Sequence, residues 1–320
     1  MDSSIVEIAQ ICLNAGQLAP EQIEVLLGAD YYDLLYWANR IRERFFGNQI
    51  GICSIVAGRL GGCDQDCKFC AQSARYNGGY IETKITSDET ILDVARQARD
   101  SGVRRFGIVY SGRGVSEKEL GRLEGLIKQI HDLKLEVCGS FGIITVEQAQ
   151  RLVRSGLTGY NHNLETSKGH FSEIVSTHDY ADRVRTIEAA KEAGLGVCAG
   201  GIFGIGESDK DRVDMARELR RLGVDTVPMN FLHPIEGTPL ADSKRLEPRE
   251  ILRIIALYRF ILPSVNLKVA GGRVLNLGDM QSWIFYAGAN AVLSGNYLTT
   301  SGRSVKEDMR MLDALGLEAK

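Results

Sequence analysis

Residues 50–73 read IGICSIVAGRLGGCDQDCKFCAQS and join a strand-forming run to a cysteine-rich loop. The apolar run at 50–58 has the length and composition of a buried strand. Cys63, Cys67 and Cys70 follow it with CxxxCxxC spacing. A doubly wound open sheet would instead carry a glycine-rich dinucleotide-binding turn after its first strand. The stretch therefore favours a parallel barrel with a functional loop after its first strand.

Beyond this stretch, apolar runs alternate with amphipathic segments along the chain. Strand candidates after the first are residues 104–112, 135–143, 159–164, 195–205, 226–232, 267–272 and 289–295. Helical spacing of apolar residues marks residues 89–102, 118–133, 146–156, 180–194, 210–223 and 248–262. The alternation predicts an α/β fold, a (β/α)8 barrel of the TIM type.

No composition shift or linker divides the chain. Apolar residues at helical spacing between residues 4 and 46 predict two or three further helices. We therefore expect residues 1–46 to form a helical N-terminal cap and residues 47–320 to form the barrel with a C-terminal helix, in a single domain overall.

Composition excludes several classes of protein. With 44% hydrophobic and 25% charged residues, the chain has the balance of a soluble globular protein. A net charge of −3 gives no electrostatic footprint for nucleic acid or an anionic membrane. No apolar run approaches about 20 residues, and no signal peptide is recognisable, so we expect a cytoplasmic protein. Seven cysteines in such a chain indicate reduced thiols or metal ligands.

The three loop cysteines indicate metal chemistry. Three thiolates on one short loop can bind three irons of a [4Fe–4S] cube and leave the fourth iron without a protein ligand. The alternatives are a structural zinc site or three unrelated buried thiols. Zinc sites usually show two Cys or His pairs about a dozen or more residues apart, and no second pair is present here. In a barrel this loop falls at the carboxyl ends of the strands, where active sites lie.

With Phe69 before its last cysteine, the loop resembles the signature of radical S-adenosylmethionine (SAM) enzymes. From about residue 35 to residue 316 the chain also resembles the biotin synthase family, through GGCDQDCKFCAQSARY, GYNHNLETS, GVCAGGIFGIGE and AGANAVLSGNYLTT. This resemblance implies an enzyme of biotin biosynthesis, a sulfurtransferase. It would use a [4Fe–4S] cluster and SAM to insert sulfur into dethiobiotin, with the sulfur drawn from an auxiliary iron–sulfur cluster.

The resemblance also implies a SAM site around the first cluster. Cys63, Cys67 and Cys70 would hold the cluster, and its open iron would bind the amino and carboxylate groups of SAM. Glu165, where the family often has aspartate, would contact the ribose, and an arginine, Arg183, the carboxylate. Taken alone, an arginine on an amphipathic helix is usually solvated. The other implied contacts are Phe69, Tyr110, Ser111, Asn163, Gly200, Ile202 and Gly204, with Glu207 in the same glycine-rich segment.

Three asparagines would bind the substrate. Asn161 and Asn163 alternate within one strand candidate and so face the same side. With Asn230 they match the family's contacts to the ureido ring of dethiobiotin, since an amide can both donate to its carbonyl and accept from its N–H groups. Without the resemblance, capping of turns or strand ends is the simpler explanation for paired asparagines. Thr299 and Thr300 could receive the substrate carboxylate. His162, between the asparagines, is expected to point to the opposite side of the strand and to be structural.

The auxiliary cluster is where this chain departs from the family pattern. That pattern has three cysteines and one arginine, and Cys138, Cys198 and Arg273 match three of these positions. The remaining position is Gly107. Either the sulfur-donor site is lost, or two cysteines hold a cluster with an exogenous ligand, or the third ligand has moved.

Cys53, on the neighbouring first strand, favours a moved ligand, although a buried cysteine acting as a small hydrophobe is the alternative. Three thiolates also fit a four-iron cluster, so we expect an auxiliary cluster of this type rather than [2Fe–2S]. Arg273 would then be a ligand or a hydrogen-bond donor to the cluster.

Two other functions remain open from the sequence. The first is a related radical SAM mutase or lyase of the methylornithine-synthase or hydrogenase-maturation type, without sulfur transfer. The second is a non-catalytic protein that binds iron–sulfur or another metal. For the enzyme we expect an electron donor such as flavodoxin or ferredoxin, and possible homodimers on the family's example.

Overall fold

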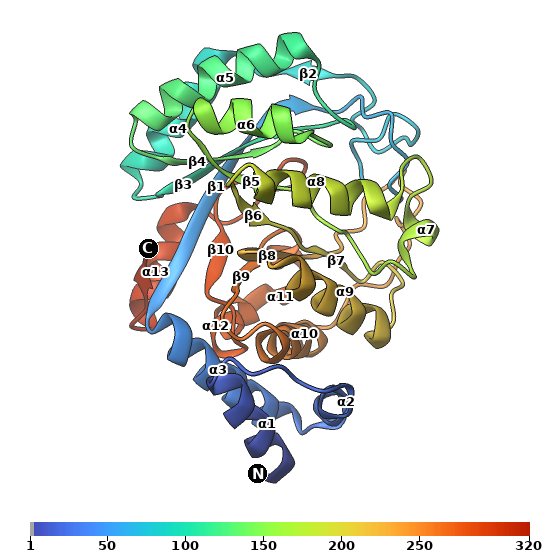
Figure 1. The fold of residues 1–320 in the computed structure, drawn as a ribbon, viewed down its shortest axis with the longest axis vertical. Coiled ribbons are helices and arrows are strands. Elements are labelled where there is room, and N and C mark those ends of the chain that lie inside the picture. The colour runs from blue at the N-terminus through green and yellow to red at the C-terminus, as the bar shows by residue number, and fades with distance from the viewer. Residues whose placement is uncertain (1–2) are drawn as a thin grey trace.

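Eight parallel strands close into a barrel at the centre of the computed structural model, which describes residues 3–320 (Figure 1). The barrel closes because the last strand pairs with the first, with Gly51 beside Ala291 and Cys53 beside Leu293. In order around the barrel the strands are β1 (Gln49–Leu60), β3 (Arg105–Tyr110), β4 (Glu136–Ser140), β5 (Leu157–Asn161), β6 (Gly196–Cys198), β8 (Thr226–Phe231), β9 (Asn266–Val269) and β10 (Ala291–Leu293).

Helices between the strands cover the outside of the barrel. They are α4 (Asp88–Asp100), α5 (Glu117–Asp132), α6 (Val146–Arg154), α8 (Tyr180–Glu192), α9 (Asp209–Leu222) and α10 (Pro248–Ile261). At the start of α4, α5, α6 and α9 a serine or threonine hydroxyl accepts a backbone N–H of the first turn. Such caps satisfy donors that have no partner within the helix and fix where each helix begins.

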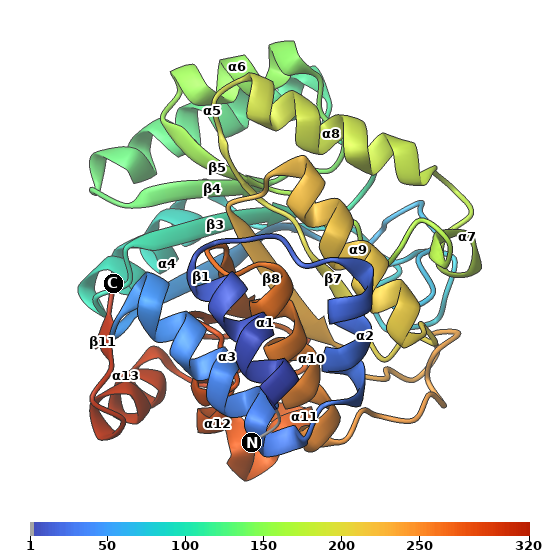
Figure 2. The same ribbon diagram turned by 60° about the horizontal axis from the view of Figure 1, so that its bottom comes forward.

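Three helices precede the barrel: α1 (Ser3–Leu13), α2 (Pro20–Gly28) and α3 (Tyr31–Phe46). They lie at the lower end of the molecule in Figure 1, and Figure 2 shows α1 and α3 in front, alongside α10. The inner face of α3, with Leu34, Leu35, Ala38 and Ile41, is buried, and α3 packs on α10 and α1.

The predicted barrel is confirmed, with one break in a strand. The sixth strand candidate forms β6 and then β7 (Gly201–Phe203), which pairs with β8. At the break, a Cβ on Gly200 would lie 2.0 Å from the carbonyl oxygen of Pro228, so only glycine fits there. Short elements that we did not predict are β2 (Lys84–Ile85), α7 (Phe171–Ile174), α11 (Arg273–Leu277), the 3-10 helix η1 (Gly278–Ser282), α12 (Trp283–Tyr286) and β11 (Glu318–Ala319). The expected C-terminal helix is α13 (Val305–Ala314).

No helix within residues 3–320 combines the length and the apolar character needed to cross a bilayer.

A buried arginine ties α10 to the closing strands of the barrel. The Arg259 side chain is fully buried, and its Nε donates to the Gly288 carbonyl at 2.8 Å. Its Nη2 donates to Asn290 Oδ1, also at 2.8 Å, and the same oxygen accepts the Leu267 N–H of β9. Its Nη1 donates to the carbonyl oxygens of Leu262, Pro263 and Val265.

We expect Arg259→Met to lower the free energy of unfolding by at least about 3 kcal/mol, because each hydrogen bond from a charged donor contributes about 1.5–3 kcal/mol. Urea titration followed by circular dichroism measures the change. Arg310→Met, at an exposed position of α13, is the control and should leave stability unchanged. Equal stability of the two variants would contradict the anchoring role.

Candidate active site and inner thiol group

The cysteine loop follows β1 at the carboxyl end of the barrel. Its backbone is held by hydrogen bonds from Cys63 N to the Gln72 oxygen at 3.0 Å and from Cys70 N to the Cys67 oxygen at 2.9 Å. The turn into the loop has φ +74° at Gly61, where a Cβ would lie 2.4 Å from the Glu82 oxygen. Glycine is therefore required where the chain leaves the strand.

The three loop cysteines line one cavity, which we call the upper cavity. Most residues predicted to bind the cofactor or substrate line the same cavity: Phe69, Tyr110, Ser111, Asn161, Asn163, Glu165, Arg183 and Asn230. These residues come from the loop, from the carboxyl ends of β3, β5 and β8, and from α8. The barrel thus brings together side chains that are up to 167 positions apart, from Cys63 to Asn230.

The loop thiols suit a cluster in their chemistry. Burial raises the pKa of Cys67 to about 12 and that of Cys70 to about 11, so these thiols need cationic partners to become thiolates. Among residues 3–320, no group of three His, Cys, Asp or Glu side chains could hold a single metal ion. An iron–sulfur cube does not require three protein ligands on one metal ion, since each thiolate binds its own iron.

Three buried polar atoms beside the upper cavity have no hydrogen-bond partner within the described residues. They are Asn161 Oδ1, His162 Nε2 and Arg183 Nε. Buried polar atoms are rarely left unpaired in native proteins. A polar molecule in the cavity could satisfy the acceptor of Asn161 and the cationic donor of Arg183, so the site fits a ligand with N–H groups and an anionic group.

Arg183 is held in place by Glu165 and by the strand end. Its Nη1 donates to the Asn163 carbonyl at 2.9 Å and lies 3.4 Å from Glu165 Oε1. Burial raises the pKa of Glu165, and the nearby Arg183 opposes this shift. Glu165 also has φ +71°, an uncommon value for a residue with a side chain. A strained backbone and a buried carboxylate are typical of a functional site.

The three predicted substrate asparagines differ in what they already bind. Asn163 Oδ1 accepts the Gly200 N–H at 3.2 Å, and Asn230 Oδ1 accepts the Gly271 N–H at 2.9 Å. Their amide groups thus stabilise strand ends, which is the capping role that paired asparagines have when no ligand is considered. Asn161 has the unpaired acceptor and is the asparagine best prepared for a ligand.

The glycine-rich segment does not line the upper cavity as we expected. A Cβ on Gly204 would lie 3.1 Å from Leu246 Cγ, and a Cβ on Gly200 would lie 2.0 Å from the Pro228 oxygen. Ile202 lines a neighbouring cavity, which Thr299 and Thr300 also line and which shares Phe69, Cys70 and Asn230 with the upper one.

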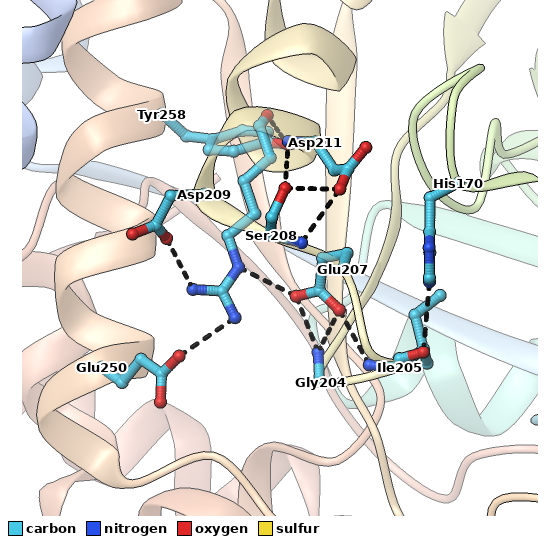
Figure 3. Close-up of polar contacts among 10 residues, drawn as sticks. His170, Gly204, Ile205, Glu207, Ser208, Asp209, Asp211, Glu250 and Tyr258 are labelled. Atoms are coloured by element: carbon cyan, nitrogen blue, oxygen red, sulfur yellow. Dashed lines mark hydrogen bonds and ion pairs between the residues drawn. The ribbon is translucent and has the colours of Figure 1, made fainter.

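Glu207 stabilises the turn that ends this segment (Figure 3). Its carboxylate accepts the N–H groups of Gly204 and Ile205 at 2.8–3.0 Å. Arg212 Nε donates to Glu207 Oε1 at 2.9 Å, and Arg212 also pairs with Asp209 and Glu250, each at 3.0 Å. The role of Glu207 is therefore to hold the backbone of the turn.

The orientation of the His162 side chain differs from expectation. We expected it to point away from the site, yet it lines the upper cavity, because β5 ends at Asn161 and strict alternation ends with it. Burial keeps the pKa of His162 well below its usual value, and Arg183 and His178 add to the effect, so its imidazole is neutral.

A second group of thiols, the inner thiol group, lies inside the barrel and consists of Cys53, Cys138 and Cys198. All three are buried and come from β1, β4 and β6. Burial raises the pKa of Cys53 and of Cys138, and each is further raised by the Cys198 thiol, so the three side chains are electrostatic neighbours. Cys53 packs against Ala270 and Leu293, and both of these line the upper cavity. The inner thiol group therefore lies directly beneath that cavity.

Arg273 does not belong to this group, which corrects our expectation. It begins α11, is fully buried, and its Nη2 pairs with Asp308 Oδ2 at 2.7 Å. Lys268 of β9 faces the three thiols instead: burial lowers its pKa, but the thiols of Cys198, Cys53 and Cys138 outweigh burial and raise it.

Lys268 is 4% exposed, and within residues 3–320 its ammonium group has no hydrogen bond or ion pair. Such a buried cation is costly without an anion beside it. The sequence signal was available: Lys268 is a charged residue inside an apolar strand run, two positions before the inward-facing Ala270.

Two family profiles together match most of the chain. Residues 59–219 match the Radical SAM superfamily, and residues 228–318 match the Biotin and Thiamin Synthesis associated domain. Both segments contribute strands to the one barrel.

Curated relatives are similar over nearly the whole length. The chain is 47% identical to a biotin synthase of Heliobacterium modesticaldum over 305 residues, which cover 95% of this chain and 92% of the relative. It is 41% identical to a biotin synthase of Clostridium botulinum over 317 residues, which cover 99% of each chain.

Solved structures share the fold at lower identity. Methylornithine synthase (PylB) gives a TM-score of 0.85 at 20% identity, covering 98% of this chain and 97% of that one. The [FeFe]-hydrogenase maturase HydG gives 0.84 at 18% identity, covering 99% of this chain and 75% of that one. At these identities the likeness establishes the fold alone.

We expect Arg183→Met to weaken equilibrium binding of SAM to the iron-reconstituted protein by at least about tenfold, because a buried hydrogen bond from a charged donor is lost. Equilibrium dialysis with labelled SAM measures the change. Arg185→Met, on the same helix with a 66% exposed side chain, is the matched control. Unchanged affinity in Arg183→Met, with unchanged iron content, would show that Arg183 only stabilises the strand end.

Proposed function

This chain belongs to the biotin synthase family of radical SAM enzymes, and from that premise we propose that it inserts sulfur into dethiobiotin to form biotin. The observation that carries the proposal is the upper cavity, which three cysteines and an unpaired asparagine acceptor share, with the inner thiol group beneath it. When bound, the [4Fe–4S] cluster and SAM supply a 5′-deoxyadenosyl radical, and the protein provides position and exclusion of water.

The residues of the upper cavity divide between cofactor and substrate. Cys63, Cys67 and Cys70 would hold the first cluster, and Arg183 would offer its free Nε to the carboxylate of SAM. Phe69, Tyr110, Ser111 and Glu165 complete the proposed SAM site. Glu165 is positioned by Arg183 and Asn163, at 3.4 and 3.3 Å.

Asn161 is the proposed anchor of dethiobiotin. Its free Oδ1 can accept a hydrogen bond from an N–H of the ureido ring, and a neutral amide suits a neutral ring in a buried site. Asn163 and Asn230 each keep one oxygen lone pair and one N–H donor for the same ring, after the hydrogen bonds that each already makes are counted. Thr299 and Thr300, in the adjoining cavity, could receive the substrate carboxylate.

The inner thiol group is the proposed auxiliary cluster site, with Cys53 in place of the cysteine missing at Gly107. Gly107 lies between Ile55 and Cys138 in the sheet, and a Cβ there would meet only Ile55 Cγ2 closer than 3.4 Å. This position is therefore open toward the barrel interior. Three thiolates and the Lys268 ammonium, which offsets negative charge, suit a four-iron cluster that carries the sulfur to be transferred.

We further propose a cytoplasmic enzyme that is reduced by flavodoxin or ferredoxin and forms homodimers. Within one domain, residues 1–46 would act as a cap on the barrel of residues 47–320.

Anaerobic incubation with SAM, a reductant and dethiobiotin tests the proposed function. We expect 5′-deoxyadenosine and biotin, both detected by mass spectrometry. Cys67→Ala should give neither product, and Asn161→Leu should still form 5′-deoxyadenosine but little biotin, because the substrate is no longer anchored. Formation of 5′-deoxyadenosine without biotin in the unaltered protein would favour a mutase or lyase instead.

Iron analysis with Mössbauer spectroscopy tests the auxiliary cluster. The reconstituted protein should hold about eight irons per chain, and Cys53→Ala about four. Cys12→Ala, which removes another buried thiol far from the group, is the control and should keep all of them. About four irons in the unaltered protein, all lost in Cys67→Ala, would contradict a second cluster.

A further inference from the structure

A second cavity, the lower cavity, reaches the inner thiol group from the opposite end of the barrel. It has a volume of about 120 Å³, and it is lined by Cys138 and Cys198 and by residues at the amino ends of strands. Among the latter are Arg105, Glu136 and Gly196, each the first residue of its strand. The upper cavity is lined instead by the last residues of β3, β4 and β5. The two cavities therefore approach the same thiols from opposite sides.

The lower cavity has room for a few molecules the size of water, whose share of liquid volume is about 30 Å³ each. It cannot admit a polypeptide or a cofactor. Cys138 and Cys198 are 6% and 4% exposed, whereas Cys12 in the cap is fully buried. The inner thiols are thus within reach of a small solute.

The charges around the inner thiols favour a small anion. Lys268, which lines the upper cavity, is a buried cation without an ion pair among residues 3–320, and Arg105, which lines the lower cavity, acts electrostatically on both Cys53 and Cys138. Glu136 lies 2.7 Å from Arg105 Nη2, at the exposed rim, where solvent weakens the pair. Asp225 Oδ2 accepts the Val197 N–H at 2.7 Å and keeps its negative charge, but Asp225 is exposed, so this charge also lies at the rim. The cations Lys268 and Arg105 act on Cys53 and Cys138 themselves.

We propose that the lower cavity is the entry route by which hydrosulfide restores the sulfur of the inner thiol group between turnovers. This inference rests on the proposed function, because each biotin carries away one sulfur atom. SAM and dethiobiotin would fill the upper cavity, so a separate entrance allows sulfur to return without their release.

The restoring step would be a ligand exchange that itself needs no oxidant or reductant. Cys53, Cys138 and Cys198 would hold the auxiliary cluster, and hydrosulfide would supply its missing sulfide and lose one proton to water at the mouth of the lower cavity. The two electrons left behind when two C–S bonds form would pass to the proposed flavodoxin or ferredoxin.

A larger side chain at Gly196 should close the lower cavity. A Cβ at this exposed position would lie 3.4 Å from the Thr158 oxygen and 3.9 Å from Asp225 Oδ2, which is ordinary contact, and its φ lies outside the left-handed region. Gly196→Leu should therefore fold and fill the cavity. Thr158→Leu narrows another point of the same rim. Gly121→Leu, on the exposed face of α5 with open space around it, is the matched control.

The test supplies ³⁴S-labelled hydrosulfide to the holoenzyme after one turnover and measures label in acid-labile sulfide and in the next biotin. We expect the unaltered protein and Gly121→Leu to take up label even when saturated with SAM and dethiobiotin. Gly196→Leu and Thr158→Leu should give a normal first turnover and then lose uptake. Uptake in both rim variants at the unaltered rate would overturn the proposal, as would a block by SAM and dethiobiotin alone.

Iodoacetamide labelling of the iron-free full-length chain separates this proposal from the proposed function. Cys138 and Cys198 should be labelled in the unaltered protein and in Gly121→Leu, and protected in Gly196→Leu, as peptide mass spectrometry would show. Labelling that Gly196→Leu does not change would overturn the entry route, whatever product the enzyme forms. A normal labelling pattern in a protein that forms no biotin would instead contradict the sulfur-insertion function and leave the entrance in place.

Discussion

The pairing of β10 with β1 is the constraint on which the interior of this protein depends. Once Cys53 lies beside Leu293 and Gly51 beside Ala291, the sheet is closed and every strand has one face inside the barrel. Closure turns Cys53 toward Cys138 and Cys198, which belong to strands that are not its neighbours in the sheet. The same closure places the loop of Cys63, Cys67 and Cys70 over that interior, so the two groups of thiols are stacked along one axis.

Small residues create the space that the inner thiol group occupies. A Cβ on Gly159 would lie 2.9 Å from the Cys138 Sγ, so any side chain there would displace the thiol. Gly107 likewise leaves room beside Cys138. Barrel interiors are usually filled by layers of branched apolar side chains. This barrel has glycine, cysteine and a lysine at the corresponding depth. Such an interior has less favourable packing energy than one filled with apolar side chains, and it leaves space for a polar site.

The sequence was sufficient to predict the barrel and the cysteine loop, because alternation of apolar and amphipathic segments and the CxxxCxxC spacing are local patterns. The sequence was insufficient where the register of a strand decides which of its residues face the interior of the barrel. Arg273 was assigned by its place in a motif, but the strand that faces the thiols ends before it, at Val269, and Lys268 takes the inward position. His162 was misplaced because strict alternation was extended beyond the end of β5. No sequence pattern indicated that the Pro228 backbone approaches Gly200 so closely that a side chain is excluded there.

Lys268 links the stability of the protein to the occupancy of its site. A buried ammonium group without an ion pair destabilises the fold, and the neighbouring thiols offset this cost only when they are ionised. Burial alone opposes their ionisation, as the raised pKa values of Cys53 and Cys138 show. In the proposed auxiliary cluster, iron would resolve this conflict, because it would stabilise thiolates, and the thiolates would then compensate the lysine. The charge pattern that suits an anionic cluster would therefore also make the protein more stable when the cluster is bound.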